Sequence, residues 1–272
     1  MKRRTLLAAT TSALLSGAVS RGRASAQVAT PTTAGDEAVT VIRWELQRIA
    51  AGNGATTPDD PSNYWFQLLP DGTVAIQADC NQGGGAYALA GSSLTFGDLV
   101  TTDLACGADS IGEEFARNLG YVVAFTRTTN AGDELVLDLM ADGGQLFFAP
   151  SLAGVVWEWV AFEGGDGNVV TAADPSRYTI EFLGDGTVQV LADCNQGTAT
   201  ATIDAPGIDL TVATTKMACP GDSQDADFLR YLDEAVSYVI RDGRLALSLP
   251  MDAGIALFRP TISETSPATP TS

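Results

Sequence analysis

Asp79-Cys80-Asn81-Gln82-Gly83 recurs as Asp193-Cys194-Asn195-Gln196-Gly197, at an offset of 114 positions in a chain of 272 residues. Upstream, Leu69-Pro70-Asp71-Gly72-Thr73-Val74 matches Leu183-Gly184-Asp185-Gly186-Thr187-Val188 at the same offset. Downstream, Thr101-Thr102 with Ala105-Cys106 matches Thr214-Thr215 with Ala218-Cys219 at an offset of 113. Landmarks in one order with slowly drifting offsets indicate a duplicated domain. The chain length also suits two domains, which we place at residues 37–150 and 151–260.

Each copy has the pattern of a β-rich domain. An Asp-Gly turn separates alternating apolar runs at 64–69 and 73–78, and again at 178–183 and 187–192, which is a strong hairpin signal. Further strands are expected at 41–46 and 155–160, and a closing hairpin at 135–139 with 145–148. The predicted fold class is α+β and β-rich: each domain is a meandering antiparallel sheet or partly closed barrel with one packed α-helix and one disulfide.

One helix is predicted after the second cysteine of each copy, because apolar residues recur there at helical spacing. Asp109 or Ser110 is the expected N-cap in the first copy, and Asp222 or Ser223 in the second. The apolar residues assigned to these helices are Ile111, Phe115, Leu119, Val122 and Val123, and then Phe228, Leu232, Ala235, Val236 and Val239.

Four cysteines allow three pairings, and the repeat selects Cys80 with Cys106 and Cys194 with Cys219. Structural disulfides are typical of exported proteins, whereas reactive thiols and metal sites usually involve other partners such as histidine. We therefore predict a disulfide in each domain.

The absence of histidine from all 272 residues excludes Ser-His-Asp triads, Cys-His pairs and histidine-ligated zinc. Lys216 is the only lysine beyond the leader, and Asp103 stands at its place in the first copy. No catalytic residues, cofactor site or metal site are therefore predicted. A loop with Glu163, Asp166, Asn168 and Asp174 does not match the spacing of an EF-hand.

Asp79 and Asp193 could in principle supply the paired carboxylates of a glycosidase. A turn role is favoured, in which each side chain accepts backbone N–H bonds. Asn81 and Asn195 are likewise predicted to fix the turn after the strand or to adopt a positive φ, and Gln82 and Gln196 complete the motif.

The four tryptophans fall into two groups. Trp44 and Trp157 are aligned between the copies and flanked by apolar residues, so they are predicted core residues. Trp65 and Trp159 are specific to one copy and are the better candidates for surface aromatics.

Residues 1–26 have the features of a signal peptide: five basic and no acidic residues, a mildly apolar stretch from Leu6 to Val19, and Ala24-Ser25-Ala26 before a cleavage point at Gln27. Arg3-Arg4-Thr5-Leu6-Leu7 is similar to the twin-arginine export signal. The apolar stretch is too short for a membrane span. We expect a flexible linker at 27–36 and a disordered Ser/Thr/Pro-rich tail at 261–272.

Removal of the leader leaves ten basic and 33 acidic residues, a net charge of −23. Such a charge repels phosphate backbones and anionic lipids, so neither nucleic acid nor stable membrane insertion is expected. The expected location is the periplasm, the cell surface or the extracellular space.

The run from Trp44-Glu45-Leu46 through Asp79-Cys80-Asn81-Gln82 to Ala105-Cys106 resembles the META domain, the family of the heat-shock protein HslJ. Trp157-Glu158-Trp159, Asp193-Cys194-Asn195-Gln196 and Ala218-Cys219 carry the resemblance in the second copy. It implies a small β-rich domain of bacterial envelope or secreted proteins, linked in some members to heat shock and antibiotic tolerance. It implies no enzymatic activity and no catalytic residues.

The functional expectation is an exported, non-enzymatic tandem META-domain protein that binds an unidentified protein or small ligand of the cell envelope, with a role under stress. Two alternatives stay open: a carboxylate-dependent glycan hydrolase and a purely structural surface protein.

Overall fold

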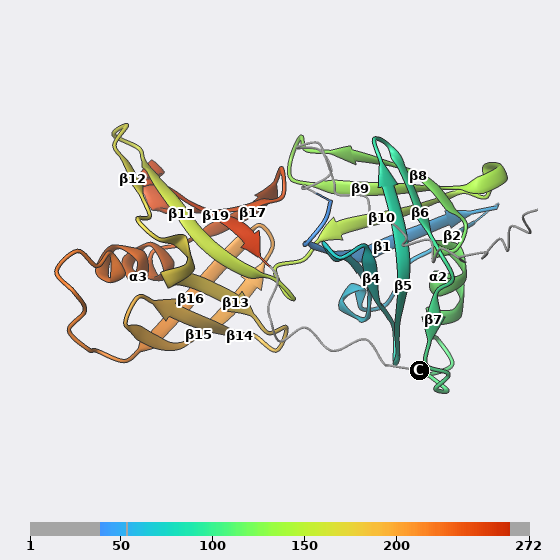
Figure 1. Ribbon diagram of the computed structural model, residues 1–272, viewed down its shortest axis with the longest axis horizontal. Helices are drawn as coiled ribbons and strands as arrows, with labels where there is room; N and C mark the ends of the chain where they lie inside the picture. The colour runs from blue at the N-terminus through green and yellow to red at the C-terminus, as the bar shows by residue number, and fades with distance from the viewer. Residues whose placement is uncertain (1–38, 53, 262–272) are drawn as a thin grey trace, which may run out of the picture.

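The computed structural model describes residues 39–52 and 54–261, which form two β-barrels side by side along the long axis of the molecule (Figure 1). The predicted leader, the predicted linker at 27–36 and the tail beyond Thr261 lie outside the described residues. Thr261 itself ends the last strand, so the prediction of disorder was wrong at that residue.

The first domain is a nearly closed antiparallel barrel. Its strands follow the order β6-β5-β4-β3-β1-β10-β9-β8, with β2 paired to β1 and β7 paired to β5. Between the end strands β6 and β8, Phe125 N donates to Ser92 O at 2.9 Å. The strands are β1 (Arg43–Ala51), β2 (Gly54–Thr56), β3 (Tyr64–Leu68), β4 (Thr73–Ala78), β5 (Asn81–Ala90), β6 (Ser93–Phe96), β7 (Val100–Thr101), β8 (Val122–Thr128), β9 (Glu134–Leu139) and β10 (Gln145–Pro150), and the helix is α2 (Gly112–Leu119).

The second domain repeats this arrangement as a closed barrel. The order β11-β13-β14-β15-β16-β17-β18-β19 returns to β11 through the β11–β19 pairing, and β12 pairs with β11. The strands are β11 (Val156–Gly164), β12 (Val169–Thr171), β13 (Tyr178–Phe182), β14 (Thr187–Ala192), β15 (Asn195–Asp204), β16 (Gly207–Thr214), β17 (Ser237–Arg241), β18 (Arg244–Ser248) and β19 (Gly254–Thr261), and the helix is α3 (Asp225–Asp233). The β-rich α+β class and the two tandem domains are therefore confirmed.

The aligned tryptophans lie in the barrel cores, as predicted. Trp44 and Trp157 are fully buried, and their indole N–H groups donate to Val39 O and Leu152 O, each at 2.9 Å. A buried indole needs such an acceptor, because an unpaired N–H in the core would cost free energy. The same bond in both domains fixes the first strand of each barrel to the segment before it.

Each helix packs an apolar face onto its barrel but is shorter than predicted. Phe115 and Leu119 of α2 are fully buried, as are Phe228 and Leu232 of α3. The residues that follow do not continue either helix: Val122 and Val123 begin strand β8, Ala235 and Val236 lie in the loop after α3, and Val239 lies in strand β17. A short apolar run has no distinctive period, so the helical spacing was extended too far.

The predicted N-caps were wrong by at least one residue, although a serine before each helix still accepts an amide of its first turn. Ser110 Oγ accepts the amide of Gly112 at 3.2 Å, and Ser223 Oγ accepts that of Asp225 at 3.3 Å. The residues at the N-cap positions themselves are Ile111 and Gln224. Their amides donate to the hydroxyl groups of Tyr64 and Tyr178, which join each helix start to its barrel.

The two barrels are joined by a buried carboxylate. Asp133, whose side chain is fully buried, accepts the amides of Asp242 at 3.0 Å and Gly243 at 2.8 Å, and it pairs with Arg127 at 2.9 Å. Asp133 N also donates to Ile240 O at 2.8 Å. The β17–β18 turn of the second domain is thereby held by the loop before β9 of the first.

A second contact lies at the connector between the domains. Gln67 Nε2 donates to Gly154 O at 3.0 Å, and Ser151 N donates to Arg43 O at 2.9 Å. Gly154 has a φ of 74°, and a Cβ there would displace the Arg43 guanidinium, so this position favours glycine. No helix among the described residues is long and apolar enough to cross a membrane.

Candidate functional site

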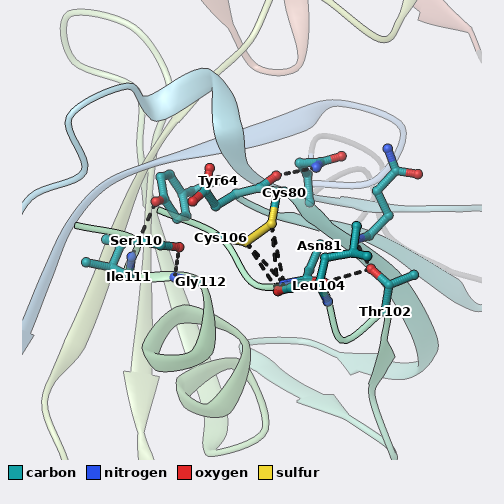
Figure 2. Close-up of a disulfide and its surroundings, with 12 residues drawn as sticks. Tyr64, Cys80, Asn81, Thr102, Leu104, Cys106, Ser110, Ile111 and Gly112 are labelled. Carbon is teal, nitrogen blue, oxygen red and sulfur yellow. Dashed lines mark hydrogen bonds between the residues drawn. A yellow bond between two sulfur atoms is a disulfide. The ribbon is translucent and has the colours of Figure 1, made fainter. Parts of the chain in front are cut away.

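The repeated Asp-Cys-Asn-Gln motif forms a clamp between the start of one strand and the loop of the second cysteine (Figure 2). In the first domain, Asn81 Oδ1 accepts the amide of Leu104 at 2.7 Å and the hydroxyl of Thr102 at 2.9 Å. Asn81 Nδ2 donates to Leu104 O at 3.1 Å. The Asn81 amide therefore binds both backbone groups of Leu104 and fixes the loop that carries Cys106.

The second domain repeats the clamp with the same atoms. Asn195 Oδ1 accepts from Met217 N at 2.8 Å and from Thr215 Oγ1 at 3.0 Å, and Asn195 Nδ2 donates to Met217 O at 3.2 Å. The disulfides Cys80–Cys106 and Cys194–Cys219 are both formed, which confirms the predicted pairing. Gln82 and Gln196 contribute through their backbones, each accepting the amide of the clamp threonine.

Positive φ falls on the aspartates of the motif and not on the asparagines. Asp79 and Asp193 have φ values of 60° and 59°. Aspartate tolerates this left-handed conformation better than most residues, which accounts for its presence at both turns. The side-chain role differs from the prediction: the Asp193 carboxylate binds the guanidinium of Arg177, and its buried Oδ2 has no hydrogen-bond partner.

The prediction that Trp65 and Trp159 are surface aromatics was wrong. Trp159 is fully buried against Tyr178, Phe228 and Tyr231. Trp65 is only 9% exposed, and the Arg43 guanidinium covers its ring at 4.0 Å. Trp65 and Trp159 each occur in one copy because the cores of the two barrels pack differently. Neither ring offers a platform for a ligand.

Beside the first disulfide lies a groove of about 470 Å³, between the cysteine loop and the start of α2. Ala78 and Gly112 are buried, whereas Asp103, Leu104 and Glu113 are exposed, so the groove runs from a covered floor to an open rim. Its size is within the range of small-molecule sites. Figure 2 shows Gly112 and Ser110 at the helix start facing the disulfide across this space.

The corresponding place in the second domain is filled by a side chain. Asp225 stands where the first copy has Gly112, at the offset of 113 that also aligns Cys106 with Cys219. Its Oδ2 accepts from Asn195 Nδ2 at 3.2 Å. The rim differs as well, because Asp103 and Glu113 are replaced by Lys216 and Ala226. The two copies thus share the clamp but differ in the groove beside it.

The second domain has another cavity of about 470 Å³, formed by the β11–β12 turn and α3. Phe162 and Tyr231 stack on each other at 4.0 Å within it, and Arg230 covers Tyr231. Asp166 accepts the amide of Asn168 at 3.0 Å, which closes its own turn. Among residues 39–52 and 54–261, no three His, Cys, Asp or Glu side chains are grouped closely enough to hold a metal ion.

Comparison of the aligned copies shows one sign of this groove in the sequence. The substitution of Asp103 by Lys216 is visible there, but its significance depends on the neighbouring pairs Gly112 with Asp225 and Glu113 with Ala226. Those pairs lie on the helix, 31 and 32 positions beyond Asn81, and only the fold brings them to the clamp.

The comparisons with known proteins agree with the repeat. The family model for the META domain matches residues 37–152 and 150–260. No curated protein matches the chain.

Two solved structures are similar to part of the chain. An NMR structure of a protein from Burkholderia xenovorans is 20% identical, with a TM-score of 0.38, and the match covers 48% of this chain and 97% of that one. A crystal structure of a DUF4847 family protein from Bacteroides vulgatus is 16% identical, with a TM-score of 0.33, over 42% of this chain and 96% of that one.

Two adjacent matches to one family model cover nearly all of the described residues, and each spans one barrel with its helix and disulfide. The chain belongs to the META domain family and contains two tandem copies of the domain.

Proposed function

We propose that this protein is an exported, non-enzymatic binding module of the cell envelope, and that its ligand occupies the groove beside Cys80–Cys106. The observation that carries the proposal is the difference between the copies at one place: the first has an open groove of about 470 Å³, and the second has Asp225 bonded to its clamp asparagine. Duplication followed by closure of one site leaves a single binding position on a doubled scaffold.

Export is supported by the basic leader with its Ala24-Ser25-Ala26 cleavage motif and by the two disulfides. Disulfides persist in oxidising compartments such as the periplasm and the extracellular space. N-terminal sequencing of the protein from cell fractions tests this: a mature chain that starts at Gln27 outside the cytoplasm is expected, and an uncleaved cytoplasmic chain would contradict it.

A non-enzymatic role is supported by the chemistry of the side chains. The chain has no histidine, and the motif acids Asp79 and Asp193 belong to separate barrels, each next to its own disulfide. Asp193 is engaged by Arg177, as expected of a structural carboxylate. The resemblance to HslJ supports a role under envelope stress.

A thermal-shift screen of residues 27–272 tests the binding role, because a ligand that binds only the folded state raises the melting temperature. The screen contains cell-wall fragments, sugars, amines, divalent metals and antibiotics. The matched control is the variant Asp103→Lys/Glu113→Ala, which gives the first rim the residues of the second copy.

We expect a ligand that stabilises the wild type and not this variant. A screen in which no compound shifts the melting temperature, or in which every shift persists in the variant, would contradict the proposed site. Turnover of a cell-wall glycan that is lost in Asp79→Asn or Asp193→Asn would contradict the non-enzymatic role.

A further inference from the structure

We infer that the groove of the first domain binds an alkylammonium group, the chemistry of a polyamine or of a lysine side chain. The inference rests on the proposed binding function and names the class of ligand. Three features of the groove lead to it: its charge, its apolar rim and the residues that replace it in the second copy.

The charge of the groove favours a cation. Asp103 and Glu113 both line it and are both exposed, and none of its described lining residues is an arginine or a lysine. Two carboxylates that line one groove attract a positive charge more strongly than two isolated carboxylates. A single metal ion fits less well, because three or more protein ligands are usual for a tightly held ion.

The remaining lining suits a hydrocarbon chain next to the charge. The side chain of Leu104 is 60% exposed although its backbone is held by Asn81. Ala105 and Ala116 line the groove close to it. Methylene groups can lie along these apolar surfaces while the ammonium group reaches the carboxylates, as lysine side chains do on protein surfaces.

The floor offers polar partners for the ligand. Ser110 Oγ accepts the amide of Gly112, and Thr102 Oγ1 accepts the amide of Gln82, so each hydroxyl oxygen keeps one lone pair for a donor of an ammonium group. Because Gly112 has no side chain, the start of the helix packs directly on the backbone of Ala78 at the floor. A Cβ at Gly112 would lie 2.6 Å from Ala78 O, so this position cannot be filled without moving the helix.

The second copy keeps the apolar rim, with Met217 57% exposed, but it lacks the two rim carboxylates. Lys216 replaces Asp103, Ala226 replaces Glu113, and the Asp225 carboxylate is already bonded to Asn195. A lysine at the rim repels a cationic ligand. The clamp is common to both domains, but the acidic groove is present only in the first. We therefore assign the recognition of a cation to the first domain.

The test is an NMR titration of the ¹⁵N-labelled mature chain at low salt with cadaverine, which is a five-carbon diamine, and with pentane-1,5-diol, which has the same length and no charge. A capped Gly-Lys-Gly peptide forms a third arm and distinguishes a lysine side chain from a free amine as the source. We expect cadaverine or the peptide to shift the amides of Leu104 and Gly112, and the diol to leave them unchanged.

Two variants localise the effect. Asp103→Asn/Glu113→Gln should weaken binding at least tenfold, whereas Asp209→Asn/Asp233→Asn, which removes two exposed carboxylates from the second domain, should bind like the wild type. The spectra of the variants also report whether they fold. Equal binding by both variants, equal binding of the diol, or no shift with either amine would overturn the inference.

These outcomes separate the inference from the proposed function. If a neutral or anionic compound from the thermal-shift screen binds at Leu104 and Gly112 while the amines do not, the binding role stands and the ammonium assignment is wrong. If nothing binds at these residues in either experiment, both are wrong.

Discussion

Replacement of Asp133 by alanine should weaken the coupling between the two barrels. In the wild type this fully buried carboxylate accepts two backbone amides of the β17–β18 turn and the guanidinium of Arg127. The alanine variant leaves the two amides without their acceptor and leaves Arg127 only its 3.4 Å contact with Asp242. Removal of one partner from a buried, hydrogen-bonded ion pair costs about 3–5 kcal/mol. Because Asp133 joins the domains, the loss should appear in the free energy of unfolding of whichever domain unfolds first.

Urea unfolding followed by tryptophan fluorescence measures this loss, since Trp44 and Trp65 report on the first barrel and Trp157 and Trp159 on the second. With a slope of about 3 kcal/mol per molar urea, the first transition should move down by about 1–1.7 M. The matched control is Asp138→Ala, which removes a carboxylate whose 2.8 Å bond to Gln145 stays within the first domain and is exposed to water. A shift below about 0.3 M for Asp133→Ala, or an equal shift for the control, would refute the proposed coupling.

Three further predictions concern the clamp, the disulfides and a buried acid. Asn195→Ala should lower the free energy of unfolding by about 2–3 kcal/mol, and Asn81→Ala by about 1–2 kcal/mol. The first loss is larger because Asn195 is only 3% exposed, so water replaces its hydrogen bonds less easily. Thermal unfolding of the two variants measures the difference. Cys80→Ser/Cys106→Ser, which opens a loop with a sequence separation of 26, should cost about 3–4 kcal/mol in a urea titration, and a variant as stable as the wild type would contradict this. Burial raises the pKa of Glu45 above its ordinary value, although Ser151 and Arg43 partly offset the rise. Because the pKa of Glu45 is raised in the folded state, its contribution to the free energy of unfolding is fully present at a pH below the ordinary glutamate pKa. That contribution is lost as the pH rises through the folded-state pKa. Glu45→Gln should therefore stabilise the protein more at pH 7 than at pH 4, and the same gain at both values would show that Glu45 ionises freely in the fold.

Much of the fold follows from the sequence because the signals are local or repeated. The hairpins at β3–β4 and β13–β14 are set by Asp-Gly turns between alternating apolar residues, and both strands of each hairpin lie within a residue of their predicted bounds. The disulfide pairing follows from the repeat, since each cysteine pair recurs at one interval. The closure of each barrel has no local signal, because it joins β1 to β10 and β11 to β19 across the whole domain.

The errors have physical causes as well. Val122 and Val239 continue the apolar spacing of the helices, but β-branched residues are also typical of strands, and pairing with β9 and β18 decides for the strand. Trp159 was expected at the surface because its aligned residue in the first copy is Leu46. The second barrel instead packs Trp159 against three aromatic rings, one of which, Tyr231, takes the place of Asn118 in the first copy.

The candidate site could be predicted only in part. The motif residues indicated a structural turn, and Asn81 does hold the cysteine loop. The aspartate, however, has the positive φ, and the asparagine side chain accepts the backbone amide. The groove depends on the approach of the helix to the disulfide, which the close packing of Gly112 on Ala78 allows. Neither property is visible in a single copy of the motif.

Site-specific photo-crosslinking in cells that export the protein tests the proposed site most directly. A photoreactive phenylalanine analogue replaces Leu104 in one variant and Met217 in the other, since these residues occupy matched positions and are 60% and 57% exposed. We predict crosslinked adducts of the envelope ligand at Leu104 and none at Met217. Adducts at Met217 alone, equal adducts at both positions, or no adduct at Leu104 would contradict a binding site in the first domain.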